Sequence, residues 1–224
     1  METLASRIAR IRSDPVMARA VPFALFILLV ILASKVESPW LVVCRALLVA
    51  LVLIWFWRNY RELAAPSLTG LGSWFMALAG GLIVFAVWIG FDQDWAVLSR
   101  AKGFAPVSPD GGVDWAWAIA RLFGFALVVP VMEELFWRSL VLRWIDRHDF
   151  LSMPPREVSW RAFLITTALF AVEHERWFAG AIAGATYNWL YIRTGNLWVP
   201  VAAHVVTNGV LGIWIIYTGR WEFW

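Results

Sequence analysis

Two adjacent glutamates and an arginine stand inside an otherwise apolar stretch of the chain, in the sequence E-E-L-F-W-R at residues 133–138. An ionisable side chain inside an apolar span costs about 2.5–3.5 kcal/mol on insertion scales, so its presence needs an explanation. On a helix, Glu134 and Arg138 share a face and can pair, whereas Glu133 points about 100° away. The carboxylate left over is suited to act as a general base. An ordinary ion pair at the end of an interfacial helix is the alternative.

Two histidines and an asparagine in other apolar segments are further candidates. His174 closes the apolar run that begins near Phe163, a position that an ordinary interfacial histidine can also occupy. His204 lies about 10 Å into the last apolar segment, and Asn208 follows one turn later on the same face. A buried His and Asn can donate hydrogen bonds to a developing oxyanion, or can simply join helices. Because separate segments contribute Glu133, His174 and His204, these polar groups are predicted to converge in one reaction site.

The elements that position these residues are predicted to be membrane-spanning helices. Of the 224 residues, 61% are hydrophobic and 16% are charged, whereas a soluble domain has about half and about a quarter. A span needs about 20 mostly apolar residues. Seven runs qualify, at about 20–36, 40–57, 73–91, 115–135, 160–176, 177–193 and 197–218. The predicted fold is therefore all-α, a polytopic transmembrane helix bundle with about 7–8 spans.

A shared site places a condition on the fourth run. Glu133 stands near the inner end of that run and His174 near the outer end of the next, yet both must lie at one depth in the membrane. We therefore expect a long fourth helix that continues through Trp144, or one that bends at Pro130.

The chain is predicted to form one domain. Residues 1–19 are a cytoplasmic N-terminal segment, residues 20–218 a single transmembrane helical domain with its motif-bearing core at about 115–218, and residues 219–224 a C-terminal tail. With the N-terminus inside, twelve arginines fall on the inner side and five Arg or Lys on the outer side, which agrees with the positive-inside rule. The predicted location is a bacterial inner membrane, with the N-terminus cytoplasmic and the lipid bilayer as partner.

Charge, cysteine and glycine positions add minor expectations. The net charge of +3 comes with no separate basic stripe, so no nucleic-acid partner is predicted. The single cysteine, Cys44, is predicted to be a small packing residue. Arg45 and Arg121 lie near the predicted outer side, where snorkelling to the interface is expected. Gly180 and Gly184 form a G-x-x-x-G pattern, for which packing within the chain is favoured over dimerisation.

The order of the three motifs resembles one known family. E-E-x-x-x-R at 133–138, F-x-x-x-H at 170–174 and H-x-x-x-N at 204–208 resemble the CPBP family of CAAX prenyl proteases and bacteriocin-processing enzymes, also called Abi proteins. The resemblance covers about residues 115–218. It implies a glutamate-dependent intramembrane endopeptidase that uses an activated water to cleave lipidated or membrane-anchored protein substrates.

The resemblance also implies roles for the residues. Glu133 and His174 would activate the water, His204 and Asn208 would stabilise the oxyanion, and the ion pair of the first motif would shape the site. No cofactor is expected. The alternative is a divalent metal such as zinc, held by Glu133, His174 and His204 with a position left for water. The implied catalytic residues are Glu133, Glu134, Arg138, His174, His204 and Asn208.

Two other functions remain open from the sequence. A non-catalytic membrane scaffold or immunity protein on the same fold would need the buried polar residues only for stability. A small proton-coupled transporter would use the intramembrane Glu and His as a proton relay. Transporters commonly show inverted repeats, and none is evident in this sequence.

Overall fold

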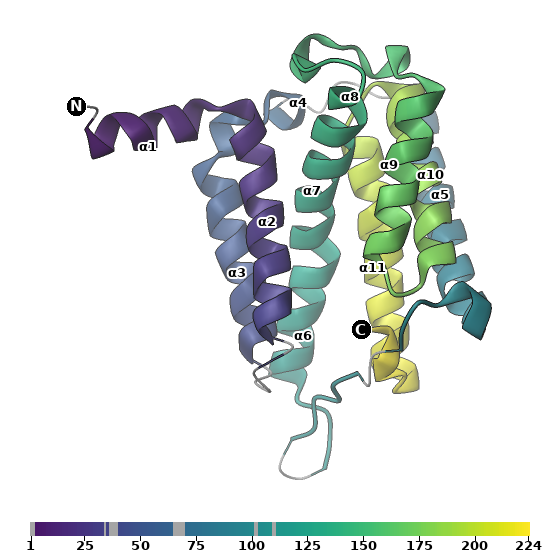
Figure 1. Ribbon diagram of the computed structural model, residues 1–224. Coiled ribbons are helices and arrows are strands. Elements are labelled where there is room, and N and C mark those ends of the chain that lie inside the picture. Colours follow the sequence, from purple (N-terminus) through teal and green to yellow (C-terminus); the bar gives the residue numbers. More distant parts are fainter. Residues whose placement is uncertain (1–2, 34, 36–39, 65–69, 101–102, 109–110) are drawn as a thin grey trace.

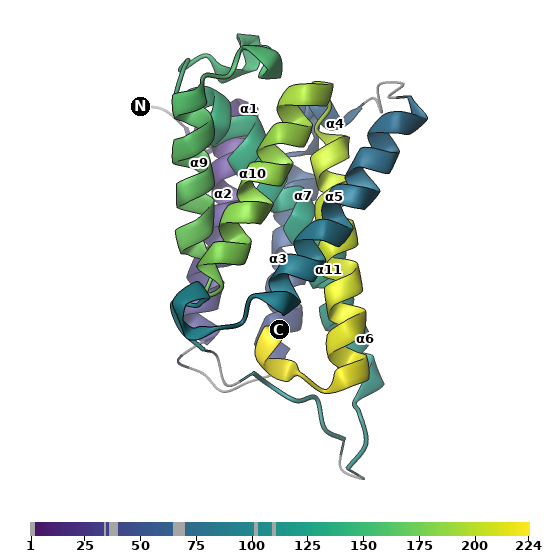
Figure 2. The same ribbon diagram turned by 90° about the vertical axis from the view of Figure 1, so that its right-hand side faces the viewer.

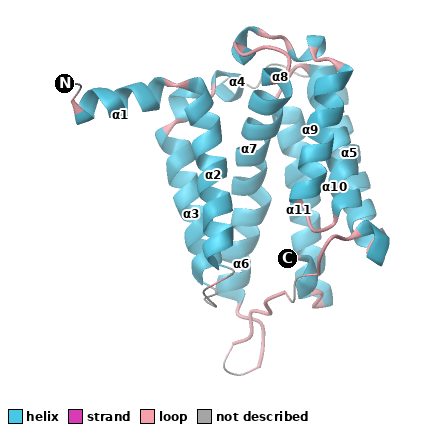
Figure 3. Ribbon diagram, viewed as in Figure 1, coloured by secondary structure: helices cyan, strands magenta, loops and turns pink. Residues whose placement is uncertain are grey.

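The computed structural model describes residues 3–33, 35, 40–64, 70–100, 103–108 and 111–224. Within these residues the chain is built of helices and connecting segments (Figure 3), and the β-type pairing among them is an isolated bridge between Val107 and Val113. The predicted all-α helical bundle is confirmed.

Seven long helical stretches follow one another within the described residues. Six are α2 (Pro15–Ala33), α3 (Trp40–Trp55), α5 (Leu71–Gly90), α9 (Trp160–Glu173), α10 (Trp177–Thr194) and α11 (Trp198–Thr218). The remaining one, Trp115–Trp144, comprises α6 (Trp115–Phe123), α7 (Val129–Glu134) and α8 (Leu142–Trp144), joined by π-helical turns at Gly124–Val128 and Leu135–Val141. Short helices are α1 (Leu4–Ser13) and α4 (Arg61–Ala64), with 3₁₀ turns at Trp57–Asn59, Asp94–Ala96, Phe150–Ser152, Pro155–Glu157 and Trp221–Phe223.

Four of the described helices are long and apolar enough to cross a membrane. They are α2, α5, the 30-residue helix Trp115–Trp144 and α11, while α3 is apolar but has 16 residues. Helix α9 has 14 residues, which span about 21 Å against a hydrocarbon core of about 30 Å. Each of the seven predicted runs contains a long helix, but the number of spans stays a prediction.

The fourth apolar run extends beyond its predicted end at residue 135, because the helix continues to Trp144. Glu133 therefore lies about 16 Å from the end of this helix, deep within the bundle. The π-helical turn Gly124–Val128 comes just before Pro130, whose missing N–H disturbs the regular helical hydrogen bonding. The expected long fourth helix is thus present.

Two groups of helices form the bundle (Figures 1 and 2). Helix α2 packs along α3 and against the long helix Trp115–Trp144, while α10 packs along α9 and α11 packs along α5. Helix α11 also contacts the long helix and so joins the two groups. Helix α1 extends sideways at the end of the bundle that holds α4 and the segment 145–159. The segment that leads into α6 lies at the opposite end.

The outside of the bundle is strongly apolar. Side chains such as Leu51, Ile54, Phe75 and Leu164 are 60% exposed or more. An apolar surface of this extent is unusual in a soluble monomer and suits lipid tails. Cys44 is also exposed, so the prediction that it packs in the interior was wrong. A single apolar residue in a run does not reveal which face of the helix it occupies.

Buried charges join the helices at the end that holds α1. The guanidinium of Arg19 pairs with Glu62 at 2.6 Å and donates a hydrogen bond to Ser139 at 2.7 Å. Ser139 also donates to Glu62, and Arg143 donates to Ser139 at 2.9 Å. This inner network, defined by Arg19, Glu62, Ser139 and Arg143, ties α2 and α4 to the long helix.

A second set of ion pairs lies at the opposite end. Asp92 pairs with Arg100 at 3.1 Å, Arg176 at 3.0 Å and Arg220 at 3.3 Å. The Arg176 guanidinium covers the ring of Phe223 at 3.7 Å, and that ring is buried. The predicted C-terminal tail, residues 219–224, therefore packs against the bundle.

Candidate active site

The second glutamate of the first motif forms a buried three-way contact. Glu134 Oε2 lies 3.1 Å from Arg138 Nε, and Glu134 Oε1 accepts a hydrogen bond from Arg138 Nη1 at 3.2 Å. The same Oε1 lies 2.9 Å from His204 Nδ1. Arg138 also donates to the carbonyl of Gly184 at 3.3 Å, and its guanidinium lies 4.4 Å from the centre of the Phe170 ring. The Glu134–Arg138 pair expected from the four-residue spacing is present. Its contacts with His204 and Gly184 connect the long helix with α11 and α10.

The first glutamate has different surroundings. Glu133 is only 4% exposed, and its Oε2 has no hydrogen-bond partner among the described residues. An unpaired buried carboxylate oxygen is rare in a purely structural role and indicates a group kept for another purpose. Adjacent positions on one helix thus separate the two carboxylates, one paired and one facing a cavity.

His174 ends helix α9 and is held in one orientation. Its Nδ1 lies 2.7 Å from the carbonyl oxygen of Phe170. Because a carbonyl only accepts, Nδ1 must carry the proton, and Nε2 is left as an acceptor. A Cβ added to Gly180 would lie 3.2 Å from the His174 Cβ. The small residues of α10 therefore let this helix pack closely on α9 within the chain, as expected.

His204 and Asn208 project from α11, one turn apart. The His204 ring stacks on Tyr187 of α10, with ring centres 4.9 Å apart and planes inclined by 22°. The Tyr187 hydroxyl donates to Thr207 at 2.7 Å, which fixes the stacking surface. Asn208 donates one hydrogen bond to the carbonyl of Phe125 at 2.9 Å, and its second N–H remains for another acceptor.

One small cavity brings four of the predicted residues together. Glu133, His174, His204 and Asn208 all line a cavity of about 90 Å³, which has room for about three waters at ~30 Å³ each. Glu134 and Arg138 do not belong to its lining and stand behind it. The predicted convergence from separate helices is therefore observed, with the ion pair as the support of His204.

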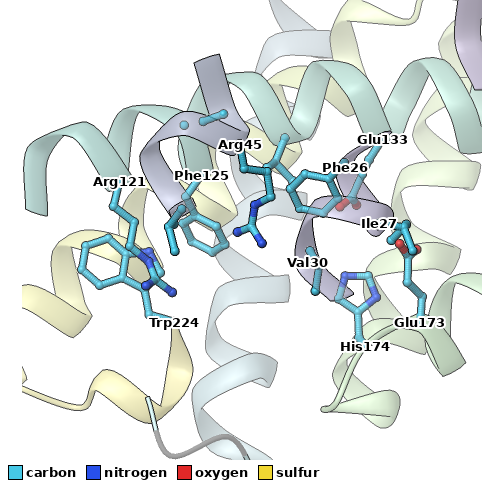
Figure 4. A pocket seen from close by; sticks show the side chains of 14 residues that line it. Phe26, Ile27, Val30, Arg45, Arg121, Phe125, Glu133, Glu173, His174 and Trp224 are labelled. Carbon is cyan, nitrogen blue, oxygen red and sulfur yellow. The ribbon is translucent and has the colours of Figure 1, made fainter. Parts of the chain in front are cut away.

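A larger cavity of about 260 Å³ shares Glu133 and His174 with the small one (Figure 4). Its wall also includes Glu173, Arg45 and Arg121. Glu173 directly precedes His174 and was not among the predicted site residues. Its Oε2 accepts a hydrogen bond from Trp137 Nε1 at 3.0 Å. The position of Glu173 directly before His174 could have indicated from the sequence that it belongs to the site. The two arginines, expected to snorkel, line the cavity instead.

The alternative metal site can be compared with this geometry. No group of three or more His, Cys, Asp or Glu side chains with metal-binding spacing occurs in the described part of the chain. The Nδ1 atoms of His174 and His204 are already engaged by Phe170 and Glu134. The two Nε2 atoms and the carboxylate of Glu133 are thus available to act on a bound water.

The segment that holds all three motifs matches a known family. Residues 115–210 match the family model of the type II CAAX prenyl endopeptidase Rce1-like proteins. No curated protein and no solved structure matches the chain. The four apolar helices and this family of membrane proteases together indicate an integral membrane protein in contact with lipid. Residues 115–210 of this chain are therefore similar to the Rce1-like type II CAAX prenyl endopeptidases.

Proposed function

We propose that the protein is a glutamate-dependent intramembrane endopeptidase that cleaves lipidated or membrane-anchored protein substrates with an activated water. The observation that carries this proposal is the single small cavity lined by Glu133, His174, His204 and Asn208. A base, an acceptor and two hydrogen-bond donors around one small cavity are the parts that peptide hydrolysis needs.

The first step places a water between Glu133 and Nε2 of His174. Glu133 takes one proton from the water while its oxygen forms a bond to the scissile carbonyl carbon. The electron pair of the carbonyl moves onto its oxygen, which becomes the oxyanion. When this intermediate collapses, the C–N bond breaks and the proton held by Glu133 passes to the leaving amine. Glu133 is thereby regenerated as a carboxylate.

The oxyanion is stabilised from α11. Asn208 offers its free N–H, and His204 offers Nε2–H when its ring carries both protons. Nδ1 of that ring lies 2.9 Å from Glu134 Oε1, so Nε2 is the nitrogen left for the oxyanion. Arg138 keeps the Glu134 carboxylate in place. This explains why an ion pair outside the cavity belongs to the catalytic machinery.

The larger cavity suits an apolar substrate. Phe26, Ile27 and Val30 of α2 line one wall of it, next to Glu133 and His174 (Figure 4). An apolar wall beside the reacting groups can hold a lipid chain attached close to the scissile bond. We therefore propose prenylated or otherwise lipid-anchored polypeptides as substrates. The mechanism uses the residues of the chain alone, and the experiment below includes a chelator.

The test is cleavage of a prenylated peptide by the purified protein in liposomes, compared with Glu133→Gln, His174→Ala and His204→Ala. Removing the base or an oxyanion donor should lower kcat by roughly 10²- to 10⁴-fold. The matched control is Glu157→Gln, which neutralises an exposed carboxylate at the inner end and should cleave like wild type. A parallel series with a metal chelator should leave the rate unchanged.

Opposite results would reject the proposal in identifiable ways. Folded Glu133→Gln protein with the wild-type rate would remove the glutamate mechanism. Loss of activity with chelator, restored by zinc, would replace it with a metal mechanism. Normal biological function in cells that carry only the Glu133→Gln variant would favour the alternative of a non-catalytic membrane scaffold or immunity protein.

A further inference from the structure

We propose that helix α1 (Leu4–Ser13) lies in the plane of the membrane surface and binds the headgroups of anionic phospholipids through its arginines. This surface is separate from the candidate active site, because the described residues of α1 line neither of the two cavities that share Glu133. The proposal therefore stands or falls independently of the proposed function.

Three apolar side chains form a stripe along α1. Leu4, Ile8 and Ile11 follow one another at intervals of four and three residues, so they lie within about 60° of one another around the helix axis. Their exposed fractions are 74%, 45% and 44%. An exposed apolar stripe on a short helix favours an apolar surface that covers it, and the boundary between headgroups and acyl chains provides one.

The arginines of α1 border this apolar stripe. On a regular helix, Arg7 lies about 60° from Leu4 on one side and Arg12 about 80° on the other, while Arg10 lies farther round the helix. All three are exposed, and the ten residues of the helix include no carboxylate. An arginine beside an apolar stripe can lay its stem along the hydrocarbon and extend its charge to the headgroups. The stripe thus fits a lipid surface, and the charges fit an anionic one.

The segment after α1 holds this helix across the end of the bundle. Asp14 accepts hydrogen bonds from the N–H groups of Val16 at 2.8 Å and Met17 at 3.0 Å, and so caps the start of α2. The Asn59 side chain donates to the carbonyl of Arg12 at 2.8 Å, which ties the last turn of α1 to the bundle. Figure 1 shows α1 extending sideways from the end of α2, which is a candidate span. Helix α1 therefore leaves the bundle at the level where a span ends.

A lipid surface fits α1 better than a second copy of the chain does. Two α1 helices that packed stripe to stripe would bring their bordering arginines together, and like charges repel. Three apolar side chains also cover only a small part of the about 800 Å² per partner that a stable protein interface buries. The bilayer, in contrast, is already held beside α1 by the spans, so weak contacts suffice for binding.

The experiment measures the depth of two faces of α1 in vesicles. A nitroxide is attached to Ile8→Cys, on the stripe, or to Ala9→Cys, about 100° round the helix, in full-length protein that carries Cys44→Ala. The vesicles contain phosphatidylcholine alone or an equal mixture of phosphatidylcholine and phosphatidylglycerol. Collisions of the nitroxide with oxygen, which concentrates in hydrocarbon, and with a water-soluble nickel chelate report its depth.

We expect the Ile8 label to be protected from the chelate in anionic vesicles and the Ala9 label to stay accessible to it. For the Ile8 label, accessibility to the chelate should be on the order of fivefold higher in neutral than in anionic vesicles. In the α1 charge variant, which combines Arg7→Gln, Arg10→Gln and Arg12→Gln, this ratio should fall to about one, because the attraction to anionic headgroups is lost.

The matched control removes three charges from the same end of the bundle but outside α1. It combines Arg147→Gln, Arg156→Gln and Arg161→Gln, all at exposed positions, and should keep the ratio of wild type. A ratio that falls equally in the control would assign the effect to overall charge and overturn the proposal.

Two results with the wild-type arginines would also overturn the proposal, so that it does not depend on the folding of any charge variant. One is equal accessibility of the Ile8 label to the chelate in neutral and anionic vesicles. The other is protection of this label that disappears when the protein is diluted with lipid, which would assign the stripe to a second copy of the chain. Protection that depends on anionic lipid and persists on dilution supports the binding of α1 to the membrane surface.

Discussion

At the scale of single residues, two neighbouring carboxylates have opposite surroundings. Glu134 contacts Arg138 and His204, whereas Glu133 faces a cavity with one oxygen lacking a hydrogen-bond partner among the described residues. A buried ion pair loses much when one member is removed, because the remaining charge stays buried without compensation. A buried carboxylate without a partner, in contrast, gives little to the stability of the fold. Substitution of Glu134 should therefore lower mainly the stability of the fold, and substitution of Glu133 mainly the activity.

The prediction is that Glu134→Gln destabilises the protein and Glu133→Gln does not. Loss of the Glu134 charge should lower the free energy of unfolding by about 3–5 kcal/mol, whereas Glu133→Gln should stay within about 1 kcal/mol of wild type or exceed it. Thermal unfolding in detergent measures both. Equal Tm values for the two variants would contradict the assignment of Glu134 to support and Glu133 to chemistry.

The sequence predicted the polar residues of the small cavity but not the extent of the larger one. The four-residue spacing of Glu134 and Arg138 was enough to place their contact, because it depends on one helix only. The place of Glu173 depends on how α9 packs against the long helix, and Arg45 depends on the position of α3. Such contacts between distant segments are not contained in a local pattern.

At the scale of helices, close approach of backbones determines where the site residues stand. A Cβ added to Gly81 of α5 would lie 2.5 Å from the carbonyl oxygen of Ala203, the residue before His204. Gly72, on the same helix, has no atom within 4 Å of such a Cβ. The packing of α5 on α11 therefore controls the position of His204.

This packing predicts different effects of one substitution along α5. Gly81→Ala should destabilise the protein by about 1–3 kcal/mol through overpacking and should lower the rate of cleavage. Gly72→Ala should be neutral or slightly stabilising, by up to about 1 kcal/mol, since alanine favours a helix. Unfolding curves and cleavage rates of both variants provide the check. A neutral Gly81→Ala would show that α5 and α11 have room to move apart.

The helices themselves were predicted more reliably than their ends. Each apolar run contains a helix, because span-length hydrophobicity is a strong signal. The fourth helix exceeds its apolar run, because the charged residues Arg138 and Arg143 interrupt the run while the helix continues to Trp144. Those charges are buried by partners from other elements, including Gly184 and the carbonyl of Met153. The π-helical turns leave no hydrophobic pattern by which a sequence would reveal them.

At the scale of the whole molecule, the charge distribution has a functional asymmetry. The inner network closes the end of the bundle near α1, while Asp92 and its arginines close the other end. The end that holds α1 and the inner network is predicted to face the cytoplasm. Within the inner network, burial alone would raise the pKa of Glu62. The charge of Arg19 and hydrogen bonds from Arg19 and Ser139 outweigh burial and lower the pKa below its ordinary value.

This lowered pKa predicts an acid-sensitive contribution to stability. A carboxyl whose pKa is lower in the folded state stabilises the fold above its ordinary pKa, and this stabilisation is lost as the pH falls through the folded value. The difference in Tm between wild type and Glu62→Gln should thus be largest near pH 7 and should shrink below about pH 4. Unfolding curves across this range test it. A difference that grows on acidification would contradict the assigned sign.

The exposed position of the only cysteine has a practical consequence. Cys44 stands one residue before Arg45 on α3 and faces outward from the bundle. A nitroxide or fluorophore attached to this thiol needs no prior removal of other cysteines, because there are none. The reporter would sit about 100° around the helix from Arg45, outside the cavity yet on the helix that borders it. Movements of α3 during turnover can therefore be followed spectroscopically in an unmutated chain.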